Sequence, residues 1–291
     1  MDPLRVLVRR GGVVESAHRV HAVAVRDGEV VEAAGDPELV TFMRSAAKPI
    51  QALPLARARE DLDDRDLAIA SSSHLADEAQ LEAVRALLAK ARAREEDLEC
   101  GPDGEPPRRI NHNCSGKHAG MLALCRARGW ATRGYRLPDH PCQQAMLAQV
   151  AEAAEVAPGT IPTGTDGCGV VTFGFTLERT AHAFGRLERL DGGEGVAAAM
   201  RARPELIRGE GAADTELMRA LAGWTSKGGA EGLLCACGDG LGVALKSEDG
   251  TSRGLAAAAA RFLGRLGYEL PTDRQPVLNS RGERVGDVVA T

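Results

Sequence analysis

The chain has 291 residues, of which 44% are hydrophobic and 26% are charged, and its formal net charge is −5. A chain of this length can bury a large core, as one domain or as two closely packed ones. Acidic and basic residues are mixed throughout, so the sequence contains neither the basic surface typical of nucleic-acid binding nor a polybasic membrane patch. We therefore expect a small-molecule substrate, with no nucleic acid and no membrane as partner.

The start of the chain and its cysteines indicate the compartment. The opening MDPLRVLVRRGG lacks the apolar core of a signal peptide, and no run reaches the roughly 20 apolar residues of a transmembrane helix. The seven cysteines are an odd number and contain no C-x-x-C pair, which is a poor disulfide framework. The sequence predicts a cytoplasmic protein with reduced thiols, some of which could bind metal.

The predicted elements form three blocks along the chain. Residues 4–34 alternate around two tight turns and predict a β-meander. Helical spacing then predicts helices over 46–58, 77–93, 115–128, 139–155, 176–190, 194–203 and 214–223. From Glu231 the pattern returns to strands, with a hairpin over 233–245 and a final helix over 252–266. We expect one domain over 1–291, with strands in 1–40 and 227–291 and a helical middle over 45–223.

The first chemical motif is Ser45-Ala46-Ala47-Lys48, at the start of a predicted helix. Residues three apart on a helix face the same way, and a neutral lysine amine can take the proton of a serine hydroxyl. The helix N-terminus would also favour the negative charge of an oxyanion. Most Ser-x-x-Lys sequences are ordinary helix surface, so this motif is specific only together with its surroundings.

Two further segments carry candidate side chains. In Ser71-Ser72-Ser73-His74, either Ser73 or His74 could act in catalysis or could simply cap the next helix. In residues 111–118, Cys114 shares one side of a helix's first turn with Lys117 or with His118.

Cys168 lies far along the chain in the glycine-flanked loop 165–169, beside Asp166. Two thiolates and one nitrogen would form a three-ligand zinc site. The alternative is two unrelated buried cysteines. A P-loop is excluded, because no glycine stands at the required position upstream of Gly116-Lys117.

Lys227 enters the glycine-rich turn 227–232 just before the C-terminal hairpin. The glycines would let a substrate or another strand approach the backbone, whereas the alternative is a surface turn with a solvated lysine. The order of strands, Ser-x-x-Lys helix, helical middle and Lys-Gly-Gly strand pair is the layout of serine β-lactamases and penicillin-binding proteins.

Five motifs together resemble a narrower family. They are R-S-A-A-K-P-I-Q at 44–51, S-H at 73–74, N-C-S-G-K-H-A-G-M-L at 113–122, T-D-G-C-G at 165–169 and K-G-G-A-E-G at 227–232. In this order they resemble the asparaginase II family, the thermolabile rhizobial type of L-asparaginase. The resemblance implies an α/β (α+β) fold similar to serine β-lactamases and glutaminases, with an antiparallel sheet from both ends of the chain.

The resemblance implies an amidohydrolase that converts L-asparagine to L-aspartate and ammonia through a Ser-Lys acyl-enzyme. Ser45 would be the nucleophile and Lys48 its base, with Ser73 and Lys227 as the second Ser-Lys pair. Cys114, Lys117 and Cys168 would bind one zinc ion per subunit. Substrate contacts would come from the remaining motif residues, namely Arg44, His74, Gly116 and Asp166. The family also implies a homodimer.

Two other functions remain open from the sequence. One is another serine amidase, a glutaminase or a β-lactamase-like acyl hydrolase, and the other is a catalytically silent zinc-binding homologue. The chain departs from the family pattern after Ser-His, where Leu75-Ala76-Asp77 replaces Ser-Gly-Glu, and at Ala212, where an arginine is usual before Asp-Thr. We expect these departures to affect the choice of substrate.

Overall fold

The computed structural model describes residues 1–271 and 274–291, which fold into two compact units. The first unit comprises Met1–Thr41, Thr176–Gly185 and Ala212–Thr291. The second comprises Phe42–Phe175 and Arg186–Gly211. Both ends of the chain therefore belong to the first unit, and the middle supplies the second.

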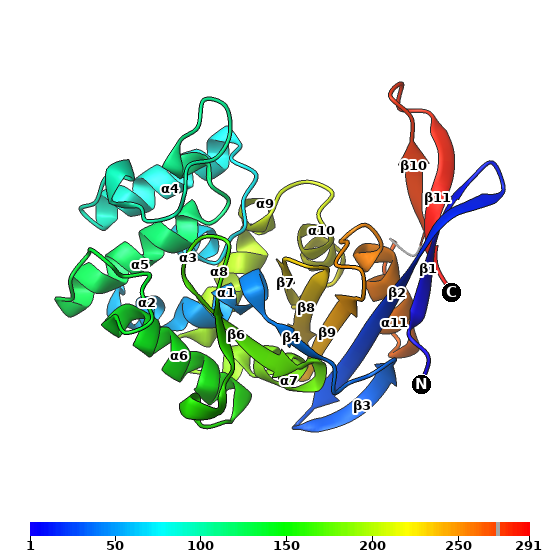
Figure 1. Ribbon diagram of the computed structural model, residues 1–291, viewed down its shortest axis with the longest axis horizontal. Helices are drawn as coiled ribbons and strands as arrows, with labels where there is room; N and C mark the ends of the chain where they lie inside the picture. Colours follow the sequence, from blue (N-terminus) through cyan, green and yellow to red (C-terminus); the bar gives the residue numbers. More distant parts are fainter. Residues whose placement is uncertain (272–273) are drawn as a thin grey trace. The chain divides into compact units, whose positions relative to one another are not determined.

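An antiparallel sheet organises the first unit (Figure 1). Its strands are β1 (Leu4–Arg10), β2 (Val13–Arg26), β3 (Glu29–Ala34), β7 (Thr225–Gly229), β8 (Leu233–Gly238), β9 (Leu241–Ser247), β10 (Arg274–Leu278) and β11 (Arg284–Ala290). Their order is β10-β11-β1-β2-β9-β8-β7, and β3 pairs with β2. The two ends of the chain meet in this sheet, with Val6 opposite Ala290. The predicted sheet from N- and C-terminal segments is confirmed.

Three helices pack on this sheet, namely α7 (Leu177–Gly185), α10 (Ala213–Ala220) and α11 (Leu255–Arg265). Alternate residues of β2, such as Val20 and Ala22, join one buried cluster with Phe262 of α11. Successive strand residues point to opposite faces, so Val23 lies on the other face, where α7 contacts β2, β8 and β9. Each face of the sheet is therefore covered by helix.

Helix α7 approaches the sheet closely because glycine stands at the contact. A Cβ atom at Gly242 on β9 would lie 2.0 Å from the Ala181 carbonyl oxygen and 2.8 Å from Gly185 Cα. Real Cβ atoms do not reach such distances, so any side chain here would push helix and strand apart.

Helices dominate the second unit. They are α1 (Lys48–Gln51), α2 (Leu53–Ala58), α3 (Asp64–Ala70), α4 (Glu78–Lys90), α5 (Ser115–Arg128), α6 (Pro141–Ala154), α8 (Gly193–Ala202) and α9 (Pro204–Ile207). The short strands β4 (Val40–Phe42), β5 (Thr163–Thr165) and β6 (Val171–Thr176) add a small sheet in the order β4-β6-β5. Short 3₁₀ turns complete the path, beginning with η1 (Arg44–Ala47).

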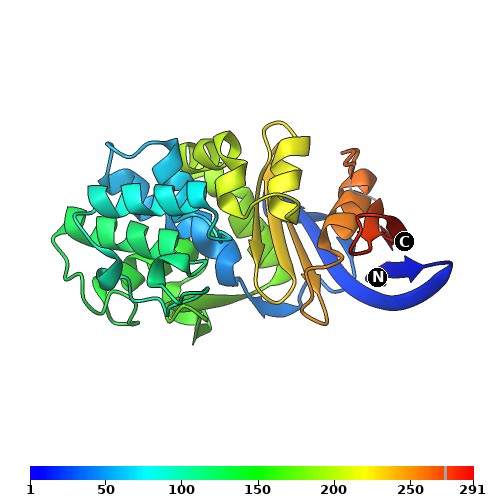
Figure 2. The ribbon, with the colours of Figure 1, turned by 90° about the horizontal axis from the view of Figure 1, so that it is seen from above.

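Helix α5 is the centre of the second unit. It contacts α2, α3, α4 and α6, and it lies side by side with α4 in both ribbon views (Figures 1 and 2). Glycine permits the contact with α3, because a Cβ at Gly116 would lie 2.2 Å from the Ile69 carbonyl oxygen. One turn later, a Cβ at Gly120 would lie 3.0 Å from Ala70 Cβ. These glycines bring the first turn of α5 against the end of α3.

The helix predicted over 115–128 has these bounds in the structure, whereas the one predicted over 46–58 is divided into η1, α1 and α2. Proline explains the division, because Pro49 and Pro54 lack the N–H that a continuous helix needs and crowd the preceding turn. The predicted, mainly helical middle is confirmed, although the short strands β5 and β6 and the helix α3 within it were not predicted.

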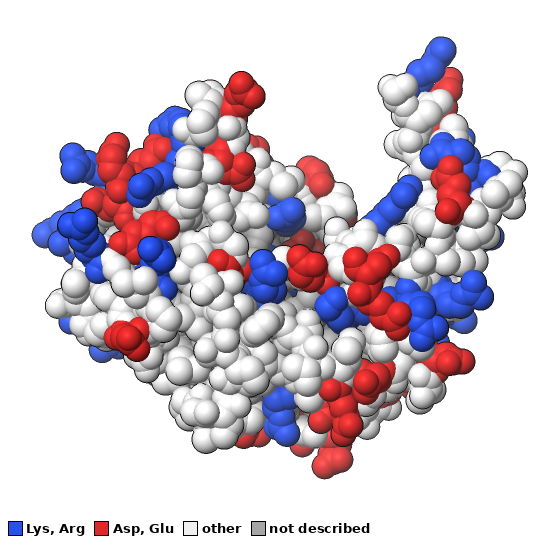
Figure 3. Space-filling view, viewed as in Figure 1, with Lys and Arg blue, Asp and Glu red and all other residues white. Residues whose placement is uncertain are grey.

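The surface carries both signs of charge. On the face drawn in Figure 3, blue lysine and arginine side chains alternate with red aspartate and glutamate. Among the described residues, no helix combines the length and apolar character needed to cross a membrane.

We expect Gly242→Ala to lower the free energy of unfolding by about 1–3 kcal/mol, because the added methyl group overpacks the contact between α7 and β9. Urea unfolding of the purified variant measures this change. Gly264→Ala on α11 is the control: no atom lies within 4 Å of its added Cβ, so stability should stay equal or rise by up to about 1 kcal/mol. Equal stability of Gly242→Ala and wild type would contradict the packing argument.

Candidate active site

Ser45 and Lys48 lie on consecutive short helices at the start of the second unit. Ser45 belongs to η1, and Lys48 begins α1 and donates its backbone N–H to the Ser45 carbonyl. Side chains three apart on a 3₁₀ turn lie one above the other. Lys48 is fully buried, whereas Ser45 is half-buried. The predicted Ser-x-x-Lys pair therefore combines a desolvated amine with a serine that solvent can reach.

The amine of Lys48 contacts the second predicted serine. Its Nζ donates to Ser73 Oγ over 2.9 Å and to the Ser72 carbonyl over 2.5 Å. Within the described part of the chain, no hydrogen bond is found for Ser45 Oγ. The structure thus joins Lys48 to Ser73 directly, although sequence reasoning paired Lys48 with Ser45.

Helix α9 and the residue after it hold Ser73 in place. The Ser73 N–H donates to the Ile207 carbonyl over 2.7 Å, and Arg208 Nη1 donates to the Ser73 carbonyl over 2.9 Å. Because both backbone groups are fixed, the Ser73 hydroxyl has one well-defined direction toward Lys48.

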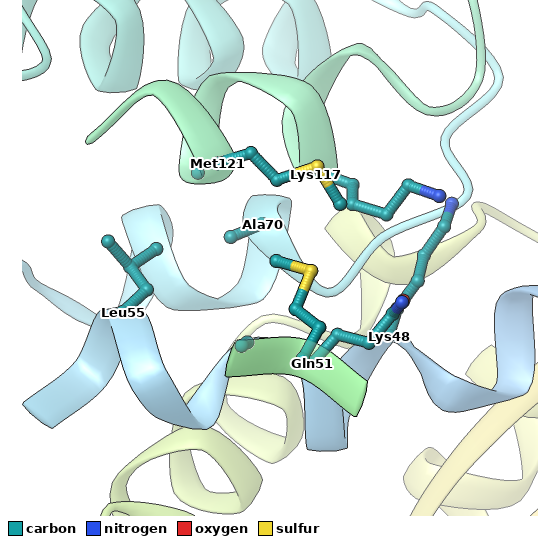
Figure 4. Close-up of a pocket in the computed structure, with 9 residues that line it drawn as sticks. Lys48, Gln51, Leu55, Ala70, Lys117 and Met121 are labelled. Carbon is teal, nitrogen blue, oxygen red and sulfur yellow. The ribbon is translucent and has the colours of Figure 1, made fainter. Parts of the chain in front are cut away.

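Two lysines meet in this site (Figure 4). Lys48 from α1 and Lys117 from α5 extend toward each other, and their nitrogen atoms lie close together in the close-up. Their stems line a cavity of about 10 Å³ whose other walls include Leu55, Ala70 and Met121. Burial lowers the pKa of Lys48, and the Lys117 ammonium lowers it further against the opposing effect of Cys114. This environment favours a neutral Lys48 amine.

Lys117 lies with the two predicted thiols. Its Nζ donates to Cys168 Sγ over 3.1 Å, and all three of Cys114, Lys117 and Cys168 are at most 4% exposed. A hydrogen bond to Cys168 lowers the pKa of Cys114, whereas the same bond raises the pKa of Cys168. Burial lowers the pKa of Lys117, but the two cysteines and Asp166 together raise it. The structure brings this predicted set together.

Asp166 bridges the cluster to Arg44. Arg44 Nε donates to Asp166 Oδ1 over 2.7 Å, while Asp166 Oδ2 lies 3.9 Å from Lys117 Nζ. Burial raises the pKa of Asp166, but the two cations outweigh it and lower the pKa overall. Arg44 has a left-handed backbone with φ +48°, and its N–H donates to Thr172 Oγ1. Such strain in a residue other than glycine is typical of functional sites.

His74 makes its contacts inside the protein. Its Nδ1 accepts from the Ala76 N–H over 3.1 Å, so Nε2 carries the proton and donates to Ser115 Oγ over 2.8 Å. Ser115 Oγ in turn donates to the Ile110 carbonyl. Both ring nitrogens are therefore engaged, and His74 ties the Ser73 segment to the start of α5.

Asp77 caps α4, and neither Ser73 nor His74 does so. Asp77 Oδ1 accepts from the Gln80 N–H, and Gln80 Oε1 accepts from the N–H groups of Leu75 and Asp77. The capping interpretation of Ser73 and His74 is therefore wrong. Gln80 also donates to the carbonyls of Glu205 and Arg208, which fastens the Ser73 segment to α9.

The other predicted residues lie in different settings. Gly116 is fully buried and has the packing role described for α5. Lys227 lies on β7 in the first unit and is 0% exposed, so the alternative of a solvated surface lysine is wrong. Its Nζ donates to the Gly228 carbonyl over 2.8 Å and lies 3.5 Å from Asp214 Oδ2.

The chemistry of the thiol cluster fits a zinc ion. Zinc takes cysteine sulfur and nitrogen ligands, and three protein ligands with an open fourth position are typical of catalytic zinc. Cys114, Lys117 and Cys168 supply two sulfurs and one nitrogen that already contact one another. Within residues 1–271 and 274–291, no group of three or more His, Cys, Asp or Glu side chains is placed to hold a metal.

Sequence reasoning missed three residues that hold the site, namely Gln80, Arg208 and Asp214. Gln80 had a usable signal, because Asp77-x-x-Gln80 is a capping box. Asp214 was seen only as part of an Asp-Thr pair, and Arg208 has no local signal because its partner is 135 residues away.

The family model described as L-asparaginase II matches residues 6–290. No match was found among the curated proteins.

Three solved structures with similar chains are a putative β-lactamase from Bacteroides dorei, a class A β-lactamase from Mycobacterium abscessus and a probable glutaminase from Bacillus subtilis. The first is 13% identical, with a TM-score of 0.47 over 84% of this chain and 93% of that one. The second is 17% identical, with a TM-score of 0.43 over 86% of this chain and 94% of that one. The third is 14% identical, with a TM-score of 0.37 over 86% of this chain and 84% of that one.

Burial and the nearby Lys48 lower the pKa of His74 from 6.5 to about 4. Between pH 4 and pH 6.5, His74 binds a proton in the unfolded chain but not in the folded chain. The contribution of His74 to the free energy of unfolding is therefore complete above pH 6.5 and decreases as the pH falls toward 4. We expect the urea midpoint of unfolding to fall as the pH is lowered from 6.5 to 4. The midpoint of His74→Gln should fall less than that of the wild type, because glutamine does not titrate. If the urea midpoints of the wild type and His74→Gln changed equally with pH, this result would contradict the lowered pKa of His74.

Proposed function

Because the chain belongs to the L-asparaginase II family, we propose that it is an amidohydrolase that converts L-asparagine to L-aspartate and ammonia through a serine acyl-enzyme. The observation that carries the proposed mechanism is the buried Lys48 amine, hydrogen-bonded to Ser73 over 2.9 Å. A desolvated lysine of lowered pKa is the kind of base that activates serine in Ser-Lys hydrolases.

In the proposed reaction, Lys48 accepts the proton of Ser45 as Ser45 Oγ attacks the side-chain amide carbon. We propose that the Ser45 N–H stabilises the oxyanion, because the N–H groups of Arg44 and Lys48 already donate to Thr172 Oγ1 and the Ser45 carbonyl. Lys48 then passes the proton through Ser73 to the amide nitrogen. The C–N bond breaks, ammonia departs, and the substrate remains bound to Ser45 as an ester. Water then attacks the ester while Lys48 takes its proton, and Lys48 returns this proton to Ser45 Oγ as the ester C–O bond breaks and aspartate is released. The hydrogen bond between Lys48 and Ser73 supports this proton path.

The pair of Arg44 and Asp166 supplies charges of both signs for an amino-acid substrate. Arg44 offers a guanidinium for the α-carboxylate, and Asp166 offers a carboxylate for the α-ammonium group. Because the two side chains already hold each other, they are oriented before substrate arrives. We propose that Arg44 and Asp166 bind the substrate, and that Lys227 acts in the reaction as the family resemblance implies.

We further propose one zinc ion per subunit, held by Cys114, Lys117 and Cys168. When bound, zinc supplies a positive charge that polarises a carbonyl oxygen or positions the substrate. The thiols must then be thiolates and the Lys117 amine must be neutral. A homodimer in the cytoplasm completes the proposal, on the strength of the family resemblance alone.

We expect the purified protein to release ammonia from L-asparagine, and Ser45→Ala to lower kcat by about a thousandfold or more, because the nucleophile is lost. A diazoketone analogue of asparagine, followed by peptide mapping, shows which serine is alkylated. Labelling of Ser73 in place of Ser45 would exchange their roles. Ammonia release from glutamine alone would indicate a glutaminase. A penicillin adduct on Ser45 would indicate a β-lactam enzyme, and no reaction with asparagine, glutamine or penicillin would indicate a silent homologue.

We expect elemental analysis to find about one zinc per chain in the wild type, and much less in Cys114→Ala and Cys168→Ala, because two of three ligands are thiols. Cys100→Ala is the matched control, since Cys100 is also buried but lies outside the proposed ligand set. Full zinc content in Cys114→Ala or Cys168→Ala would refute the set, as would equal loss in Cys100→Ala.

A further inference from the structure

A buried carboxylate fixes the lysine of β7 in the first unit. Asp214, the second residue of α10, is 3% exposed, and Lys227 is 0% exposed. Asp214 Oδ2 lies 3.5 Å from Lys227 Nζ. Lys227 Nζ also donates to the Gly228 carbonyl over 2.8 Å. The lysine is therefore held on two sides by oxygen atoms of its own unit.

The backbone also orients the carboxylate. Asp214 Oδ2 accepts from the Gly228 N–H over 2.8 Å, and Oδ1 accepts from the Thr215 N–H over 3.0 Å. Gly228 leaves room for this contact, because a Cβ there would lie 3.2 Å from Oδ2. Asp214 is thus a carboxylate held in one position beside Lys227 by two backbone N–H groups.

A buried charge without a partner is strongly unfavourable, and Asp214 and Lys227 form such a buried pair. Lys48 has a different environment, since its side-chain hydrogen bonds go to a serine hydroxyl and a carbonyl. An ammonium ion stabilises developing negative charge but cannot accept a proton. The two lysines of the proposed mechanism therefore have different chemistry.

We propose that Asp214 is a positioning residue that holds Lys227 in place as a cation, so that Lys227 supplies charge to the reaction and does not act as its base. This inference rests on the proposed function. The competing explanation is structural: Asp214 only connects α10 to β7 through the Gly228 N–H.

Asp214→Asn tests these explanations, because its one amide oxygen can still accept from the Gly228 N–H, although the charge and the acceptor for the Thr215 N–H are gone. We expect kcat for ammonia release to fall by about 10- to 100-fold. Asp66→Asn is the matched control: Asp66 is a 2% exposed carboxylate that pairs with Lys90, outside the proposed site. Its kcat should stay within about twofold of wild type. Wild-type kcat in Asp214→Asn would overturn the proposal.

A double-mutant cycle with Lys227→Met tests whether Asp214 acts through Lys227. If it does, Asp214→Asn has no further effect on kcat in the Lys227→Met background. The same fold loss in both backgrounds would overturn the proposal. Asp214→Glu, which keeps the charge, should recover part of the kcat lost in Asp214→Asn, and no recovery would likewise count against it.

Thermal unfolding gives a readout that needs no turnover. Removing one member of a buried pair leaves the other unpaired, so the double variant should have a higher Tm than the two single losses added together predict. Additive losses in Tm would overturn the ion pair. If the wild type releases no ammonia from asparagine or glutamine, the proposed function fails, and the Tm cycle still decides whether Asp214 fixes Lys227.

Discussion

The burial of the Lys48 amine is the constraint on which the site depends. An amine out of water needs acceptors, and Ser72 and Ser73 supply them from the segment after α3. Gly116 lets α5 lie against the end of α3, directly before that segment. The same first turn of α5 carries Lys117. Packing of small residues therefore decides where the reactive nitrogen atoms meet.

Charge separates the roles of the lysines. Lys48 lies among apolar walls and beside another cation, whereas Lys227 faces a carboxylate that is itself fixed by backbone N–H groups. Lys117 has a third environment, between thiols and Asp166. Side chains of one chemical type thus acquire different protonation tendencies from their neighbours alone. A family motif identifies such residues, but their neighbours determine what each can do.

The sequence predicted features that depend on local spacing. Strands at both ends, helix α5 and the joint presence of Ser45, Lys48 and the two thiols follow from periodicity and motifs. It did not predict that Lys48 bonds Ser73, because those residues are 25 apart and meet only through the packing of α3 and α5. Asp214 and the contacts of Gln80 with α9 were missed for the same reason, since the partners belong to other elements. Long-range contacts of single polar side chains leave no periodic trace.

Ala76 has φ +61°, in the segment where the family pattern usually has glycine. Alanine in this left-handed conformation costs roughly 1 kcal/mol more than glycine. The contacts of Gln80 with Leu75, Asp77 and α9 hold the segment in this shape despite the cost. Loss of the Gln80 contacts would therefore leave Ala76 with a backbone cost that glycine at the same position would not have.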